Sequence, residues 1–328
     1  MAKVLVTGGA GYIGSTTASV LLSQGYDVVV YDNLSTGHKK LIPEGAKFIF
    51  GDIRDENLIS RVVHDEKVDA IIHFAAKLYV EESVQNPISY YETNVSGGIN
   101  VINAALKNGV EKFIFSSTAA VYGSAGEEMV FETAKIQPEN PYGASKAMFE
   151  QVLSNITKKN TVNTLRAVVL RYFNVAGATL DLRHGEIYPE STHLIKVASQ
   201  VATGKRSQLI IHGTDYPTID GTGVRDYIHV LDLAQAHVDA LKYLETGGES
   251  DVFNCGYGVG FSVRQVLDSM QKVTGVPLKV VEGPRRAGDA SQIVANSTKA
   301  QKILGWKPRY NDIGLICKTA YDWEKTLS

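Results

Sequence analysis

The residues Lys3-Val4-Leu5-Val6-Thr7-Gly8-Gly9-Ala10-Gly11-Tyr12-Ile13-Gly14 join a β-branched apolar run to a glycine-rich turn. The run is typical of a buried strand, and apolar side chains recur at helical spacing from Ile13 to Leu22. Three glycines so spaced permit a tight turn, a close approach of backbone N–H groups to a pyrophosphate, and close packing of the helix on the sheet. A turn without a ligand is the alternative, but the position between a strand and a helix favours a dinucleotide site.

An acidic residue closes the second apolar run, which ends in Tyr31-Asp32-Asn33. Asp32 follows Gly11 by 21 residues, close to the ~20 that separate such a turn from a ribose-binding carboxylate. A carboxylate there accepts hydrogen bonds from both ribose hydroxyls and repels a 2′-phosphate, so NAD is favoured over NADP. The alternative is that Asp32 only caps a turn. After the third run, Asp52-Ile53 predicts a contact with the adenine by the same logic.

Strand-like and helix-like segments alternate through the first half of the chain. Nearly continuous apolar runs, typical of strands buried on both faces, lie at 3–6, 27–31, 47–50, 70–74, 112–115 and 165–170. Segments with helical spacing lie between them, among them 58–63 and 95–106. This order predicts an α/β fold with a doubly wound parallel sheet of the Rossmann type. Ligands of such sheets bind beyond the carboxyl ends of the strands.

The alternation loosens in a stretch punctuated by glycine and proline, Gly177 to Gly223, which predicts a smaller mixed α/β lobe. A helix-like and a strand-like segment within 225–257 return to the first lobe. We expect 1–176, together with 225–257, to form the dinucleotide-binding domain. The second lobe, which binds the substrate, takes 177–328, mainly 177–224 and 258–328.

Composition excludes several classes of protein. Of the 328 residues 44% are hydrophobic, and 33 basic residues nearly balance 35 acidic ones, for a net charge of −2. We therefore expect no nucleic-acid partner. No apolar run approaches the ~18 residues of a membrane span, and no cleavable hydrophobic segment opens the chain, so we expect a cytoplasmic protein without a membrane partner. Cys255 and Cys317 are too few for a disulfide framework or a zinc site, which predicts buried thiols and no metal.

A tyrosine and a lysine stand four residues apart in Asn140-Pro141-Tyr142-Gly143-Ala144-Ser145-Lys146. Asn140 is the expected N-cap of a helix that begins here. Residues at this spacing share one helix face, so the Tyr142 phenol and the Lys146 ammonium can face one ligand. The same spacing occurs at Tyr321 and Lys325, far from any glycine turn, and we assign that pair to an ordinary amphipathic helix.

Thr118 follows the fifth strand and brings a hydroxyl to the sheet edge where a nicotinamide is expected. With Tyr142 and Lys146 it predicts a proton-transfer site. A phenolate at pH 7 requires the phenol pKa to fall by about three units from ≈10, or ~4 kcal/mol. Lys146 at roughly 6–7 Å supplies about 2–3 kcal/mol at an effective dielectric of ~20, and the positive ring of NAD⁺ makes up the rest. The base is therefore expected to be strongest while the coenzyme is oxidised.

With these motifs together, the chain resembles the extended short-chain dehydrogenases/reductases over nearly its whole length, and within them the enzymes that epimerise UDP-sugars at carbon 4. The matching motifs are TGGAGYIG (7–14), DNLSTG (32–37), SSTAAVYG (116–123), PYGASK (141–146), RYFNVAGA (171–178), DYPTIDGTGVRDYIHV (215–230) and PRRAGD (284–289). Each motif alone is modest, whereas their combination is specific.

The resemblance implies an NAD-dependent isomerase that interconverts UDP-galactose and UDP-glucose. Tyr142, as phenolate, takes the proton of the sugar 4-hydroxyl while hydride passes to NAD⁺. Thr118 holds that hydroxyl, and Lys146 bonds the nicotinamide ribose. The 4-keto sugar then rotates and is reduced on its other face. A homodimer is also implied, in which helices 95–106 and 142–156 pair with their symmetry mates.

The resemblance also assigns binding residues. Those expected to contact NAD are Gly8, Gly11, Tyr12, Ile13, Gly14, Asp32, Asn33, Asp52, Ile53, Phe74, Ala75, Ala76, Asn94, Lys146 and Phe173. Those expected to contact the UDP-sugar are Thr118, Tyr142, Asn174, His212, Arg225, Arg286, Asp289 and Ile293. Arginine forks suit phosphate oxygens. His212 stands where the family often has an aromatic ring that stacks on uracil.

Other activities are weighed against this one. A 4,6-dehydratase needs an acid and a base directly after the threonine, where this chain has Ala119 and Ala120, which cannot transfer protons. A UDP-uronate epimerase or decarboxylase stays open, because the sequence does not locate the residues that recognise carbon 6. Use of UDP-N-acetylhexosamines stays open as well, since Ile293 is intermediate in size where the family has tyrosine or a small residue. In a non-enzymatic NAD sensor the tyrosine or the lysine is commonly lost.

Overall fold

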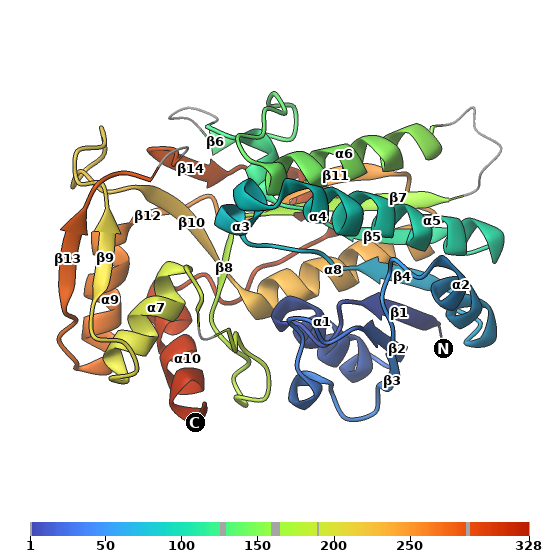
Figure 1. The fold of residues 1–328 in the computed structure, drawn as a ribbon, viewed down its shortest axis with the longest axis horizontal. Helices are drawn as coiled ribbons and strands as arrows, with labels where there is room; N and C mark the ends of the chain where they lie inside the picture. Colours follow the sequence, from blue (N-terminus) through green and yellow to red (C-terminus); the bar gives the residue numbers. More distant parts are fainter. Residues whose placement is uncertain (1, 125–128, 159–164, 189, 287–288, 328) are drawn as a thin grey trace.

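A seven-stranded parallel sheet forms the centre of the computed structural model, which describes residues 2–124, 129–158, 165–188, 190–286 and 289–327 (Figure 1). Its order is β11-β7-β5-β4-β1-β2-β3. The strands are β1 (Lys3–Thr7), β2 (Asp27–Asp32), β3 (Lys47–Phe50), β4 (Ala70–His73), β5 (Lys112–Ser116), β7 (Arg166–Tyr172) and β11 (Asp251–Cys255). All neighbours run parallel, and the central strands are buried on both faces, which confirms the predicted doubly wound sheet.

Helices cover both faces of this sheet (Figure 1). α1 (Tyr12–Ser23) and α8 (Val230–Glu245) lie side by side on one face. α2 (Glu56–Asp65), α5 (Gly98–Lys107) and α6 (Pro141–Ile156) cover the other. Each face buries its own apolar core, so the sheet is held between two helical layers and its strand ends are fixed in space.

A smaller, mixed sheet lies toward the end of the molecule that holds the C-terminus (Figure 1). Its path is β12-β10-β14-β6, with β8 also paired to β10, and only the β10–β12 pair is antiparallel among the described strands of this sheet. The strands are β6 (Met129–Val130), β8 (Asn174–Ala176), β10 (Val224–His229), β12 (Gly260–Ser262) and β14 (Gln292–Ala295). A separate parallel pair joins β9 (Leu209–His212) to β13 (Val280–Gly283). Beside it α7 (Leu194–Ala202), α9 (Val263–Thr274) and α10 (Ile313–Thr326) enclose a third core.

The segment predicted as one helix over 95–106 differs at its start. Tyr91–Gly97 forms a π-helical turn, η2, and α5 begins only at Gly98. A Cβ at Gly98 would lie 2.5 Å from the ring of Phe149 on α6, so glycine lets the two helices approach closely here. The remaining short elements are η1 (Lys39–Leu41), α3 (Val80–Gln85), α4 (Pro87–Tyr90), η3 (Ala119–Tyr122) and η4 (Ala300–Leu304).

The strand order reverses at β1, which has β2 on one side and β4 on the other. Thr7 marks this edge, because it pairs in register with Tyr31 of β2 and with His73 of β4. Loops that follow neighbouring strands diverge at such a point and leave a crevice. The glycine turn after β1 therefore opens into that crevice.

Three further features concern the cysteines, the helices and the metal-binding side chains of the described residues. Both cysteines are buried free thiols, as predicted. The described helices include none that is long and apolar enough to cross a membrane. Nor does any group of three or more His, Cys, Asp or Glu side chains in the described ranges have an arrangement that could hold a metal ion.

Candidate active site

The glycine turn packs against the backbone that follows β4. Gly8 has a φ of +72° and donates its N–H to the carbonyl of Tyr31 at 2.8 Å. A Cβ at Gly8 would lie 2.6 Å from the backbone nitrogen of Ala75, and one at Gly14 would lie 2.3 Å from the carbonyl oxygen of Gly8. Both positions therefore require glycine, and the first turn of α1 sits directly over the sheet edge with its N–H groups facing the crevice.

A cavity of about 470 Å³ follows this turn, a size typical of cofactor sites. Most residues expected to contact NAD line it: Gly8, Gly11, Tyr12, Ile13, Gly14, Asp32, Asn33, Asp52, Ile53, Phe74, Ala75, Ala76, Lys146 and Phe173, together with Tyr142. The cavity thus connects the acid after β2 with the tyrosine and lysine of α6. We expect an extended dinucleotide to lie along it, with its adenosine at the first end and its nicotinamide at the second.

Asp32 forms the adenosine end of the cavity. Its Oδ2 accepts a hydrogen bond from the backbone N–H of Ala10 at 3.0 Å, and its Oδ1 accepts one from the N–H of Leu34 at 2.7 Å. Burial raises the pKa of this carboxyl, although the two N–H donors oppose the rise. Each oxygen keeps a lone pair, so the two together can accept both hydroxyls of a ribose.

Asp52 is held by its neighbours at the same end. Arg54 donates to its two oxygens at 3.0 and 2.7 Å, and the side chain of Asn33 donates to Oδ2 at 2.8 Å. The Arg54 contact keeps the pKa of Asp52 well below its usual range. The Asp52 carboxylate is therefore charged and already oriented toward the cavity wall.

Tyr142, Lys146 and Thr118 meet at the other end. Asn140 caps α6 as predicted, by accepting the N–H of Gly143 at 2.9 Å. The Lys146 ammonium, 3% exposed, donates to the carbonyl of Ser116 at 2.9 Å. The Tyr142 phenol lies next to the Thr118 hydroxyl, which favours the ionised phenol. Thr118 does not itself line the cavity, and it reaches the end that holds Tyr142 and Lys146, here called the reacting end, only through Tyr142.

Burial changes the protonation of both groups on α6. It raises the pKa of the Tyr142 phenol, with a smaller contribution from Tyr172, and the neighbouring Thr118 hydroxyl opposes the rise. Burial lowers the pKa of Lys146 to about 7, and Glu150 opposes that fall. The coenzyme-free chain therefore keeps Tyr142 protonated at neutral pH. A phenolate needs a further positive charge beside it, and the ring of NAD⁺ is a charge of that kind.

Asn94 lies behind the cavity wall rather than on it. Its Oδ1 accepts the N–H of Lys77 at 2.8 Å, and its Nδ2 donates to the Lys77 carbonyl at 3.0 Å and to Ser145 Oγ at 2.9 Å. Asn94 thus ties the segment after β4 to α6. It fixes the wall that carries Phe74, Ala75 and Ala76.

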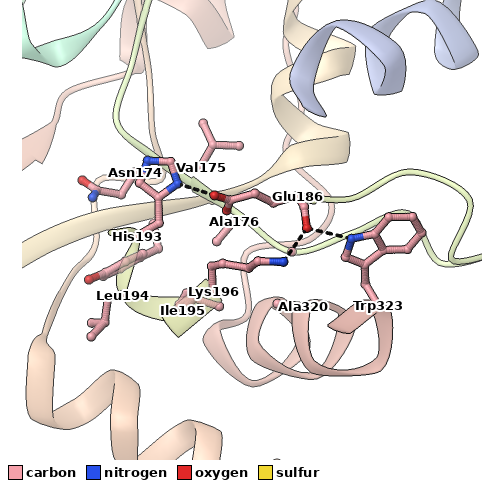
Figure 2. Close-up of a pocket in the computed structure, with 12 residues that line it drawn as sticks. Asn174, Val175, Ala176, Glu186, His193, Leu194, Ile195, Lys196, Ala320 and Trp323 are labelled. Carbon is pink, nitrogen blue, oxygen red and sulfur yellow. Dashed lines mark hydrogen bonds and ion pairs between the residues drawn. The ribbon is translucent and has the colours of Figure 1, made fainter. Parts of the chain in front are cut away.

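A second, smaller cavity of about 40 Å³ adjoins the first, and Figure 2 shows the side chains around it. Asn174 of β8 lines it, with Glu186, His193 and Trp323. His193 Nδ1 lies 2.9 Å from Glu186 Oε1, and this carboxylate raises the pKa of the imidazole. Glu186 and His193 also line the larger cavity, so they stand between the two spaces.

Three residues expected to contact the UDP-sugar gather around β10 and β14. Arg225 pairs with Asp289 at 3.2 Å, and Ile293 stands opposite Arg225 in the strand register. Ile293 is 9% exposed and packs in one apolar cluster with Phe173, which lines the larger cavity. Arg225 and Ile293 are therefore neighbours on β10 and β14, and Ile293 packs beside a residue of the cavity wall.

His212 and Arg286 lie farther along the smaller lobe. His212 ends β9 opposite Gly283, and Arg286 is exposed just after β13. Burial lowers the pKa of His212, and the charge of Arg286 lowers it further. These two residues, like Arg225, Asp289 and Ile293, lie outside both cavities.

The structure adds cavity residues that the motifs did not indicate. Tyr79 follows β4, and Tyr188 lies in the irregular segment after β8. Their rings meet edge to face, with centroids 5.9 Å apart. Glu186 and His193 come from the same irregular segment, which has no hydrophobic period that would have revealed them.

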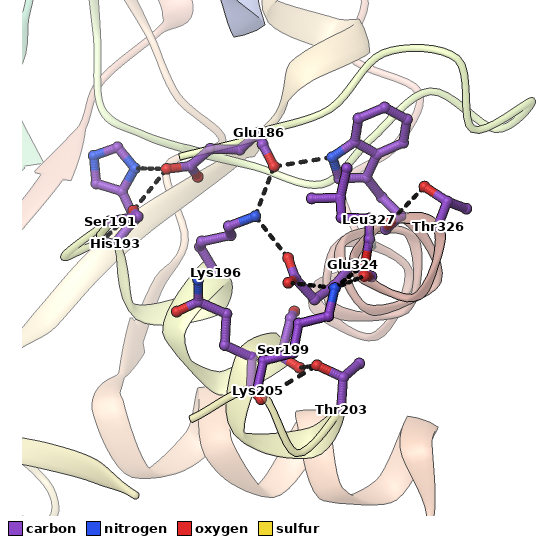
Figure 3. Close-up of polar contacts among 12 residues, drawn as sticks. Glu186, Ser191, His193, Lys196, Ser199, Thr203, Lys205, Glu324, Thr326 and Leu327 are labelled. Carbon is purple, nitrogen blue, oxygen red and sulfur yellow. Dashed lines mark hydrogen bonds and ion pairs between the residues drawn. The ribbon is translucent and has the colours of Figure 1, made fainter. Parts of the chain in front are cut away.

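A buried network fixes that segment to the C-terminal helix (Figure 3). Lys196 Nζ donates to the carbonyl of Glu186 at 2.8 Å and to Glu324 Oε2 at 2.6 Å. The indole of Trp323 donates to the same carbonyl at 2.9 Å. Glu186 thus receives its position from α7 and α10 together.

Known proteins share the sequence and the fold of this chain. Residues 4–256 match the NAD dependent epimerase/dehydratase family. A UDP-glucose 4-epimerase of Lacticaseibacillus casei is 48% identical over 98% of this chain and 96% of its own. A UDP-glucose-4-epimerase from Stenotrophomonas maltophila, solved with bound NAD and formylated UDP-arabinopyranose, superposes with a TM-score of 0.96 at 37% identity, over 99% and 98% of the two chains. A UDP-Glc/GlcNAc 4-epimerase from Campylobacter jejuni gives 0.87 at 48% identity, over 99% and 100%.

Proposed function

Because the chain belongs to the NAD dependent epimerase/dehydratase family, we propose that it is a UDP-glucose 4-epimerase, which interconverts UDP-galactose and UDP-glucose with NAD as its coenzyme. One observation carries the proposal. Tyr142, Lys146 and Thr118 converge at one end of a cavity whose other end holds Asp32. That arrangement supports a base, a cation and a hydroxyl beside a bound nicotinamide.

The reaction requires a reversible proton transfer at the sugar 4-hydroxyl. When bound, NAD supplies the acceptor for the hydride of carbon 4 and returns the hydride later. Tyr142 as phenolate removes the hydroxyl proton and gives it back after the 4-keto sugar has rotated. Thr118 orients the hydroxyl, and the Lys146 ammonium stabilises the phenolate and bonds the nicotinamide ribose.

Asp32 selects the coenzyme in this scheme. Its two oxygens accept the adenosine ribose hydroxyls, while Asp52 and Ile53 flank the adenine. The N–H groups of the turn at Gly11, with Tyr12 and Ile13, face the pyrophosphate. Asn33, Phe74, Ala75, Ala76, Asn94 and Phe173 complete the coenzyme site.

The substrate is held by its nucleotide. Arg225 and Arg286 bind the diphosphate, Asp289 binds the UDP ribose, His212 stacks on the uracil and Asn174 contacts the diphosphate. Binding energy placed in UDP leaves the sugar loosely held, and rotation between the two half-reactions requires that freedom. This division of labour is also our proposal for the lobes: 1–176 with 225–257 bind NAD, and 177–224 with 258–328 bind the UDP-sugar.

A homodimer is the proposed assembly. Val84 of α3, Ile88 of α4 and Met148 of α6 are 63%, 68% and 51% exposed, and α3 contacts both α4 and α6. Their apolar side chains lie on the outer surface of the helical layer that carries Tyr142. An apolar surface of this kind suits a symmetric contact with a second copy.

A second candidate activity is epimerisation of UDP-N-acetylhexosamines. The Campylobacter jejuni relative is a UDP-Glc/GlcNAc 4-epimerase, and Ile293 is smaller than the tyrosine expected of a strict enzyme. The aliphatic side chain packs beside Phe173 at the reacting end, where an added acetamido group would need room.

A direct assay tests the proposal. Purified protein should retain NAD, detectable by absorbance after denaturation, and convert UDP-galactose to UDP-glucose without added coenzyme. UDP-glucuronate and UDP-N-acetylglucosamine serve as competing substrates. Faster conversion of UDP-glucuronate would favour the uronate alternative, and NAD binding with no conversion of any UDP-sugar would favour the sensor.

A further inference from the structure

A buried ion pair lies directly behind the reacting end of the cavity. Glu150 stands one turn beyond Lys146 on α6 and is 8% exposed. Its carboxylate accepts a hydrogen bond from Ser117 Oγ at 2.5 Å, and two more from Arg171 at 3.0 and 2.5 Å. Ser117 and Arg171 are also buried, so solvent and salt screen this pair only weakly.

Each member of this cluster lies close in sequence to Thr118, to Lys146 or to the wall residue Tyr172. Ser117 directly precedes Thr118 after β5, and Arg171 directly precedes Tyr172 at the end of β7. Glu150 shares the inner face of α6 with Lys146. The Glu150 carboxylate therefore connects the segment that carries Thr118, the helix that carries Lys146 and the strand that ends at Tyr172.

The charges around Lys146 are unbalanced without Glu150. The titratable groups that face Lys146 are His73 on β4, Tyr142 and Glu150 on α6, and Tyr172 on β7, with Arg171 behind Glu150. Burial, with Lys146 beside it, lowers the pKa of His73 to about 3, and burial raises the pKa of both phenols, so these three groups are neutral at pH 7. Glu150 is thus the one anion of this described set, against two cations.

We propose that Glu150 is a positioning residue that keeps the Lys146 ammonium charged beside Tyr142 by neutralising the buried guanidinium of Arg171. An arginine does not release its proton, so a loss of the Glu150 charge is relieved by deprotonation of the lysine. Burial already lowers the pKa of Lys146 to about 7 with Glu150 in opposition. The inference rests on the proposed function, in which the ammonium stabilises the Tyr142 phenolate.

The test uses the NAD-loaded protein and Glu150→Gln, Arg171→Met and the double variant. The Tyr142 phenol is titrated by ultraviolet difference absorbance, with Tyr142→Phe as the blank, and kcat and KM for UDP-galactose are measured from pH 6 to 9. Glu324→Gln is the matched control, because it breaks the buried pair with Lys196 (2.6 Å), which borders the smaller cavity and is not part of the Tyr142–Lys146 site (Figure 3).

In Glu150→Gln we expect the phenol pKa to rise by about one unit or more and kcat at pH 7 to fall at least ~10-fold, with KM changed less than about twofold. The double variant should recover most of both effects, because it removes the unpaired cation. Glu324→Gln should lower the melting temperature and leave the phenol titration unchanged.

Two results would overturn the proposal. The first is an unchanged phenol titration in Glu150→Gln. The second is a double variant whose phenol pKa and kcat are as impaired as those of Glu150→Gln, because a purely structural role of Glu150 predicts that result. If Glu150→Gln does not fold, the double variant decides, because removal of both charges must leave the phenol pKa near that of the wild type. A wild type that fails to convert UDP-galactose would contradict the proposed function. The phenol titration, which needs no substrate, would still test Glu150.

Discussion

The phenol of Tyr142 on α6 lies next to the hydroxyl of Thr118, which follows β5. In the sequence η3 and β6 come between these two elements, yet the two side chains meet where the cavity reaches Lys146. The hydroxyl lowers the phenol pKa, whereas burial raises it by more. In the coenzyme-free chain the phenol therefore stays protonated, although the hydroxyl already lies beside it.

Replacing Tyr142 by phenylalanine removes the base and keeps the ring. We expect kcat for UDP-galactose to fall by at least ~100-fold, the usual contribution of general acid–base catalysis, while calorimetry finds UDP affinity within about threefold of wild type. Tyr321→Phe is the matched control, because Tyr321 has the same spacing to a lysine on the surface of α10. Equal kcat values for the two variants would contradict the role of Tyr142.

Asp32→Asn tests the coenzyme end. A charge-assisted hydrogen bond is worth about 1.5–3 kcal/mol, so we expect NAD to bind ~10- to 100-fold more weakly, and discrimination against NADP to shrink. Fluorescence titration of coenzyme-depleted protein with NAD and NADP measures both. Asp27→Asn is the control, since Asp27 begins the same strand and pairs only with Lys3 at the surface among the described residues. If the ratio of the dissociation constants for NAD and NADP is unchanged in Asp32→Asn, Asp32 only caps a turn and does not select the coenzyme.

The larger sheet could be predicted because its strands leave few alternatives. The runs at Val4–Val6 and Val28–Tyr31 are too short for helices, rich in β-branched residues and bounded by turn residues. The glycine turn could be located for a similar reason, since its residues are constrained by local backbone geometry. The N-cap at Asn140 could be predicted as well, because capping depends on the residue type at the first turn of the helix.

Contacts set by distant packing were out of reach of the sequence. Glu186 is positioned by Trp323, which lies 137 residues farther along the chain. Glu150 and Arg171 lie on different elements, α6 and β7, and no spacing rule pairs them. The π-helical turn at Tyr91–Gly97 and the close approach of Gly98 to Phe149 are likewise not contained in the local apolar pattern.

Buried histidines predict sensitivity to acid. Burial lowers the pKa of His73 to about 3 and those of His229 and His237 to about 4, from ≈6.5 in the unfolded chain. The unfolded state therefore binds more protons below pH 6.5, and stability present above that pH is lost toward pH 4. Each histidine contributes up to about 1.4 kcal/mol per pH unit over that window.

We expect the melting temperature of the coenzyme-free protein to fall steeply between pH 6.5 and 4, and less steeply in His237→Phe. His237 Nε2 is buried without a hydrogen-bond partner among the described residues, so phenylalanine should be tolerated at neutral pH. His64→Gln is the control, with a side chain 77% exposed. Identical pH slopes for wild type and His237→Phe would show that this imidazole does not contribute.

Ile88→Glu tests the proposed dimer. In a twofold-symmetric contact each substitution buries two unpaired charges, one from each subunit, and both destabilise the dimer. We therefore expect light scattering to report a monomer for Ile88→Glu and a dimer for the wild type. Ile219→Glu is the control, because Ile219 is 85% exposed in the other lobe. A dimer that survives Ile88→Glu would place the contact elsewhere on the surface.

Ile293 tests substrate choice. Tyrosine at this position fills space next to Phe173, so we expect Ile293→Tyr to lower the ratio of kcat/KM for UDP-N-acetylglucosamine to that for UDP-galactose by ~10-fold or more, and Ile293→Ser to raise it. Overpacking in Ile293→Tyr should also cost about 1–3 kcal/mol of stability, which thermal unfolding measures. Val294→Ser is the matched control, because Val294 is equally buried and points to the opposite face of β14. If neither change at Ile293 alters the ratio, or Val294→Ser alters it as much, Ile293 does not set substrate choice.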